Sequence, residues 1–97
     1  MMFGDQTDES VAREILAHAR DHDVNFIDTA DVYSKGKSES MVGTLIESQR
    51  DDWVLATKVG NKMSERPNES QYSRTWVLRE CDASLKRLAT DRIDIYY

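Results

Sequence analysis

Three ionisable side chains that could together transfer a proton lie at the ends of two apolar segments. Asp28 directly follows the apolar run 24–27, Tyr33 comes five residues later, and Lys58 closes the segment 53–58. If the two segments are neighbouring parallel strands, the three side chains converge on one rim of the sheet. Reactive groups of parallel α/β proteins collect at this carboxyl end of the strands.

The three residue types suit the reduction of a carbonyl group. An ammonium group favours the ionised form of a neighbouring phenol, so Lys58 beside Tyr33 would make Tyr33 a general acid near neutral pH. Asp28 would supply the counter-charge that a poorly solvated Lys58 needs. No side chain delivers hydride, so a nicotinamide cofactor would have to supply it while Tyr33 protonates the oxygen.

Each of these residues also has an ordinary structural explanation. Asp28 could be a turn or capping residue, Tyr33 could cover the sheet as a loop aromatic, and Lys58 could extend its charge to solvent. Asp31, in the loop between Asp28 and Tyr33, is expected to be solvated. Residue types and spacing alone leave these alternatives open.

The apolar pattern predicts helices that alternate with strands. The predicted helices span about 8–22, 39–49 and 74–89, and the predicted strands about 24–29, 53–58 and 93–97. This alternation implies an α/β fold with parallel strands and right-handed crossovers. Three such strands could form a small open sheet, or they could be part of a (β/α)8 TIM barrel, which needs about 250 residues.

The first two predicted helices have recognisable starts and apolar faces. Thr7 is expected to cap the first, whose inward stripe contains Val11 and Ile15. Ser38 is expected to cap the second. Gly43 lies inside the second helix, where it either costs roughly 1 kcal/mol relative to alanine or permits close packing on the sheet.

Ser73 is expected to cap the third predicted helix. The residues expected to face inward from this helix are Val77, Cys81, Leu85 and Leu88. The polar loop 60–73 that precedes it is long for a strand–helix connection, and long loops of this kind are often functional.

Composition argues against several other classes of function. The 97 residues form at most one domain, and the net charge of −5 disfavours nucleic-acid or anionic-membrane binding. No apolar run approaches the roughly 20 residues that span a bilayer, and the N-terminus lacks the pattern of a signal peptide. The single cysteine, Cys81, rules out an intrachain disulfide and fits a reducing, cytoplasmic compartment.

Other candidate sites are weaker. His18 and His22 have a spacing that can bind metal, but no cysteine or carboxylate pattern completes a site, and no metal is expected. Cys81 is interpreted as a small core residue. The sequence contains neither a Gly-x-Gly-x-x-Gly nor a P-loop pattern, so no Rossmann or P-loop site is predicted.

Several motifs, in the correct order, resemble the aldo-keto reductase family. The motifs cover essentially the whole chain. Met2-Phe3-Gly4 resembles the loop after the family's first strand, and residues 26–33, together with 36–39 and Gly43, resemble its second-strand motif. Residues 54–60 resemble its third-strand motif, and residues 84–88, Asp91 and 93–97 resemble the approach to its fourth strand. The family is a (β/α)8 barrel that reduces aldehydes and ketones with NADPH.

The resemblance implies a role for each candidate residue. The family's catalytic tetrad is Asp, Tyr, Lys and His, and Asp28, Tyr33 and Lys58 match its first three members. Tyr33 would donate the proton, Lys58 would tune it, and Asp28 would hold Lys58 and touch the nicotinamide side of the cofactor. Met2 is a further candidate for cofactor contact, and the substrate would be a small carbonyl compound.

The chain departs from the family pattern at both ends. The family's histidine falls five residues after the position of Asp94, and the chain stops three residues after it. The first strand is missing unless Met1 is its last residue, as are strands five to eight with their cofactor loops. We therefore expect a single incomplete domain, an N-terminal part of a barrel, that is inactive alone and marginally stable or self-associating.

Two other interpretations stay open at this point. The chain could belong to a non-catalytic barrel subunit that serves as a binding or regulatory module. It could also be a free-standing three-layer α/β domain.

Overall fold

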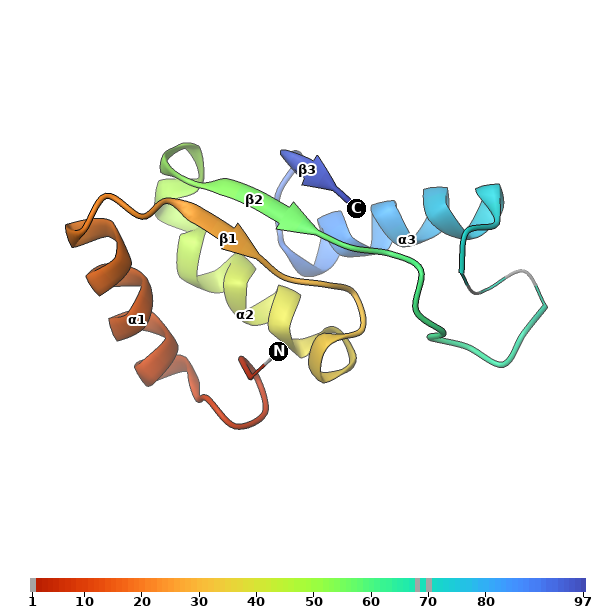
Figure 1. Cartoon of the computed structure of the whole chain (residues 1–97), viewed down its shortest axis with the longest axis horizontal. Coiled ribbons are helices and arrows are strands. Elements are labelled where there is room, and N and C mark those ends of the chain that lie inside the picture. The colour runs from red at the N-terminus through yellow and green to blue at the C-terminus, as the bar shows by residue number, and fades with distance from the viewer. Residues whose placement is uncertain (1, 68, 70) are drawn as a thin grey trace.

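The predicted alternation of helices and parallel strands is confirmed by a computed structural model, which describes residues 2–67, 69 and 71–97 (Figure 1). Met1, considered above as the end of a preceding strand, lies outside the described residues. The elements are α1 Glu9–Asp21, β1 Phe26–Asp28, the short 3-10 helix η1 Tyr33–Gly36, α2 Lys37–Ile46, a second 3-10 helix η2 Glu47–Asp52, β2 Val54–Thr57, α3 Arg74–Arg87 and β3 Ile95–Tyr96.

The three strands form a parallel sheet in the order β1-β2-β3. Asp28 at the end of β1 pairs with Ala56 of β2, which pairs with Ile95 of β3. The helices lie on one side of the sheet, with α2 beneath the strands and between α1 and α3 (Figure 1). This two-layer arrangement fits the predicted part of a (β/α)8 barrel and differs from the three-layer alternative.

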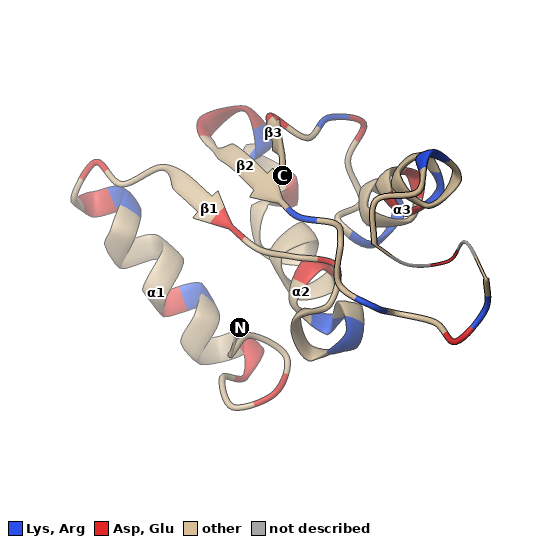
Figure 2. Ribbon diagram, turned by 45° about the vertical axis from the view of Figure 1, so that its right-hand side comes forward, with Lys and Arg blue, Asp and Glu red and all other residues tan. Residues whose placement is uncertain are grey.

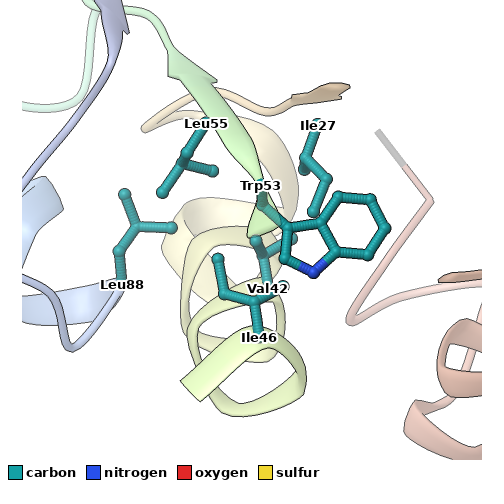
Figure 3. Close-up of a cluster of buried hydrophobic side chains, with 6 residues drawn as sticks. All are labelled: Ile27, Val42, Ile46, Trp53, Leu55 and Leu88. Carbon is teal, nitrogen blue, oxygen red and sulfur yellow. The ribbon is translucent and has the colours of Figure 1, made fainter. Parts of the chain in front are cut away.

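The hydrophobic core fills the space between the sheet and α2 (Figure 3). It is built from Ile27, Val42, Ile46, Trp53, Leu55 and Leu88, each at most 8% exposed. The opposite face of β1 is open, because Phe26 and Asp28 alternate with buried Ile27 and are exposed. Only one face of the first strand is therefore covered.

Two of the expected helix starts are wrong. Asp8, rather than Thr7, caps α1, because its carboxylate accepts a hydrogen bond from the Val11 amide at 3.0 Å. This bond lowers the pKa of the Asp8 carboxyl. Helix α2 begins at Lys37 after Gly36, whose φ of 88° is readily adopted only by glycine, so Ser38 lies inside the helix and is buried. The expected Ser73 cap of α3 is confirmed by its bond from the Trp76 amide.

The buried faces of α1 and α3 also differ from the predicted ones. Val11 and Ile15 are exposed on α1, and Ala12 is buried instead. On α3 the buried residues are Trp76, Glu80 and Ser84, whereas Val77, Cys81 and Leu85 are only partly buried. The apolar stripe alone did not reveal these faces, because α3 packs a largely polar surface against α2.

Gly43 is required by close packing, although its partner is not the sheet. A Cβ atom added at Gly43 would lie 2.4 Å from the carbonyl oxygen of Leu88 and 2.8 Å from its Cα. Both atoms belong to the backbone, which cannot rotate away as a side chain can. The glycine therefore sets the distance between α2 and the end of α3.

We expect Gly43→Ala to destabilise the protein by about 1–3 kcal/mol, because overpacking outweighs the gain in helix propensity. Urea unfolding measures the change. The control is Thr44→Ala, at an exposed position of the same helix, which we expect to be close to neutral. A Gly43→Ala variant as stable as the wild type would contradict the packing argument.

Candidate active site

The structure brings Asp28, Lys58 and Tyr33 together at the carboxyl end of the sheet. The Lys58 Nζ donates to Asp28 Oδ2 at 2.6 Å and to the Tyr33 hydroxyl at 3.5 Å. It also donates to the Thr29 carbonyl at 3.0 Å. Figure 2 shows the acidic tip of β1 beside the basic position that follows β2. The predicted convergence of the three side chains is therefore confirmed.

Backbone hydrogen bonds fold the loop after β1 over the end of β2. The Thr29 amide donates to the Ala56 carbonyl at 2.9 Å, and the Asp31 amide donates to the Lys58 carbonyl at 3.2 Å. A turn then closes where the Tyr33 amide donates to the Ala30 carbonyl at 3.2 Å. These bonds return Tyr33 to the rim and hold its ring near Lys58, whose Nζ lies 5.1 Å from the ring centroid.

The electrostatics of the site keep Lys58 charged. Partial burial lowers the pKa of Lys58, but the hydrogen bond and charge of Asp28, followed by those of Tyr33, outweigh this effect. The net pKa of Lys58 is raised above its ordinary value. An ammonium group therefore faces the Tyr33 hydroxyl and would stabilise a phenolate there.

A cavity of about 460 Å³ opens beside Tyr33. It is lined by Val32, Tyr33, Ser34, Asn61 and Lys62. Its volume falls within the range of small-molecule sites. The cavity joins the loop after β1 to the first residues of the 60–73 loop, so the long loop contributes to the rim.

Asp31 is not the solvated loop residue that the sequence suggested. It is 1% exposed, because the loop turns its side chain inward, away from the open rim. Burial, followed by the charge of Glu80, raises the pKa of Asp31 to about 6. The prediction that Asp31 is exposed to solvent is therefore wrong.

Sequence reasoning also missed a buried ionic cluster below the rim. Glu39 is 0% exposed, and its carboxylate accepts from Thr57 Oγ1 at 2.6 Å and from Arg87 Nε at 2.5 Å. Arg87 also pairs with Glu80. A usable signal was present, since Glu39 precedes Val42, Gly43 and Ile46 by three, four and seven residues and so shares their buried face.

The remaining candidates gain no support as sites. Met2 is 55% exposed, and its backbone carbonyl accepts from the Asp5 and Thr7 amides, so its cofactor contact stays a prediction. His18 and His22 stack at 4.3 Å between ring centroids. Within the described residues, no group of three or more His, Cys, Asp or Glu could hold a metal ion. Burial raises the pKa of Cys81, which does not suit a thiolate nucleophile.

No helix in the described part of the chain is long and apolar enough to cross a membrane.

The sequence and the fold both match known aldo-keto reductases. The profile of the Aldo/keto reductase family matches residues 1–97, and the chain therefore belongs to this family. It is 39% identical over 93 residues to "Uncharacterized oxidoreductase YqkF" of Bacillus subtilis, a match that covers 93% of the chain and 30% of the relative. It is 40% identical over 100 residues to "Probable voltage-gated potassium channel subunit beta" of Arabidopsis thaliana, covering 98% of the chain and 30% of the relative.

A solved structure supports the same assignment of the fold. The holo form of aldo-keto reductase AKR11C1 from Bacillus halodurans matches with a TM-score of 0.79 and 38% identity, covering 93% of this chain and 31% of that one. The chain thus spans about 30% of the length of the relatives that it matches.

We expect Asp28→Asn to lower the pKa of Lys58, because the substitution removes the charge that most favours the ammonium form. The Cε chemical shift of Lys58, followed against pH by NMR, measures the change. The internal control is the Cε chemical shift of Lys62, which pairs with Glu65 at 2.7 Å. An unchanged or higher pKa of Lys58 would contradict the assigned role of Asp28.

Proposed function

We propose that the complete protein containing this chain reduces small aldehydes or ketones with NADPH and that Tyr33 is its general acid. The observation that carries the proposal is the position of the Lys58 ammonium group, within 2.6 Å of the Asp28 carboxylate and 3.5 Å of the Tyr33 hydroxyl. Family membership and an oxidoreductase relative support it.

The three residues divide the work of proton transfer. The Tyr33 hydroxyl donates its proton to the carbonyl oxygen of the substrate, and the phenolate left behind is stabilised by the Lys58 ammonium group. Asp28 holds Lys58 in position through their ion pair. The cavity beside Tyr33 gives a small carbonyl compound access to this hydroxyl.

The residues at the rim fit a nicotinamide. The Asp28 side chain is 46% exposed at the carboxyl edge of the sheet, so a planar ring can approach it while Lys58 remains paired. Asp28 and the exposed Met2 are the residues of this chain that we assign to cofactor contact. The nicotinamide, when bound, supplies the hydride for the carbonyl carbon. A holo form among the related structures supports a bound cofactor in the family.

The isolated 97-residue chain is proposed to be inactive. Each of β1 and β3 has one neighbouring strand in the described sheet, and the face of β1 that carries Phe26 and Asp28 is uncovered. We expect the purified chain to show no NADPH-dependent reduction in a 340 nm assay. Turnover by this chain would overturn the expectation.

We expect Tyr33→Phe in the complete protein to lower kcat for carbonyl reduction by about 10²–10⁴-fold, the usual contribution of a general acid. Steady-state kinetics with an aromatic aldehyde measures kcat, and fluorescence titration measures NADPH affinity, which should change little.

The matched control is Tyr72→Phe, which removes a phenol hydroxyl from a residue that is 78% exposed. This variant should retain activity. Equal activity of the Tyr33→Phe variant and the wild type would refute the proposed role of Tyr33.

A second candidate function is that of a non-catalytic subunit. The Arabidopsis relative described as a potassium channel subunit beta, 40% identical, favours it. Tyr33→Phe and Lys58→Met distinguish the two functions. An enzyme would lose carbonyl reduction in both variants, whereas a structural subunit would show no reduction in any form and would retain its protein partner in a pull-down.

A further inference from the structure

Asp31 is a buried carboxyl group without hydrogen-bond partners. It is 1% exposed, and neither Oδ1 nor Oδ2 has a hydrogen-bond partner among the described residues. The Val32 amide is near enough to lower the pKa of Asp31, but it does not satisfy either oxygen. Buried polar groups are nearly always paired, so a buried carboxyl group left in this state needs a physical explanation.

The surroundings of Asp31 disfavour its ionised form. Glu39 of α2 and Glu80 of α3 are both buried, and Arg87 pairs with each of them at 2.5 Å. The guanidinium group of Arg87 therefore already pairs with two carboxyl groups other than that of Asp31. A third negative charge in this space would be repelled by the other two.

The other groups that face Asp31 do not supply a positive charge. Tyr96 on β3 donates its hydroxyl to the Val77 carbonyl at 3.3 Å. Burial raises the pKa of Tyr96 well above its usual value, so Tyr96 stays neutral. The Cys81 thiol is neutral as well, since burial and Asp82 raise its pKa. Arg87 supplies a positive charge that lowers the pKa of Asp31.

Asp31 is also connected directly to the candidate active site. Its backbone amide donates to the Lys58 carbonyl at 3.2 Å, and the next turn is closed by the bond from the Tyr33 amide to the Ala30 carbonyl. The backbone of Asp31 therefore ties the short loop that carries Tyr33 to the residue that follows β2. A displacement of Asp31 toward solvent would take Tyr33 with it.

We propose that Asp31 is a positioning residue whose protonated side chain packs the loop 29–33 against α2 and α3, and that loss of its proton moves Tyr33 away from Lys58. Its effect on catalysis rests on the proposed function, whereas its effect on the loop does not. Burial and the charge of Glu80 place this proton loss at about pH 6.

The test follows the ring resonances of Tyr33 against pH in the complete protein, with the signal assigned by its loss in Tyr33→Phe. The wild type should show a transition near pH 6, and Asp31→Asn, which keeps the shape and stays neutral, should keep the low-pH shift throughout. The comparison with Asp31→Asn isolates the contribution of Asp31 from that of every other titrating group. Asp21→Asn, at an exposed position of α1, should retain the wild-type transition.

Glu80→Gln gives a second and directional test. It removes the charge that most disfavours ionisation of Asp31, so the transition of Tyr33 should move to lower pH. If Asp31→Asn does not fold, Glu80→Gln still tests whether the protonation of Asp31 positions Tyr33. A transition at unchanged or higher pH in Glu80→Gln would overturn the proposal.

The stability of the fold and the rate of carbonyl reduction should both depend on the protonation of Asp31. The pKa of Asp31 is raised from 3.8 to about 6 in the folded protein. The folded state therefore binds more protons than the unfolded chain between these values, and stability should fall as pH rises from about 4 to 6. This decrease should be smaller in Asp31→Asn.

The kcat for carbonyl reduction should likewise fall as pH rises through about 6 in the wild type but not in Asp31→Asn.

The outcomes separate this inference from the proposed function. The same Tyr33 transition in wild type and Asp31→Asn would overturn the positioning role. A Tyr33 transition that Asp31→Asn removes, in a protein that reduces no carbonyl compound, would support the positioning role and refute the reductase.

Discussion

The double ion pair of Arg87 with Glu39 and Glu80 joins α2 to α3 beneath the end of β2. Glu39 is fully buried, and Arg87 and the Thr57 hydroxyl both donate hydrogen bonds to its carboxyl group. A buried pair of this kind adds little net stability relative to apolar packing, but breaking it is costly because an unpaired charge is left in the interior. The pair therefore specifies one relative placement of the two helices and the strand.

This placement determines where the candidate site forms. Thr57, held by Glu39, is the last residue of β2, and Lys58 follows it directly. Gly43 permits the same arrangement from the other side, since any side chain there would collide with the backbone of Leu88. The cluster under the sheet thus fixes the base of Lys58, while Asp28 fixes its charged end.

The site combines a rigid base with an open rim. Below the rim, buried polar groups are held by specific bonds, and above it Asp28, Lys58 and Tyr33 are partly exposed to solvent. Rigid strand ends that present reactive groups to an accessible edge are typical of (β/α)8 enzymes. Asp31 connects the two regions, because its amide belongs to the rim and its carboxyl group lies in the interior.

The sequence by itself determined the alternation of helices and parallel strands, the positions of Asp28 and Lys58 at strand ends and the cap at Ser73. These features depend on local periodicity and on the rule that parallel strands end at one edge. Only the tertiary structure decided that Asp31 and Glu39 are buried, because the burial of a polar residue depends on which partners other elements bring to it. Arg87 lies 48 residues from Glu39, and no local pattern records that contact.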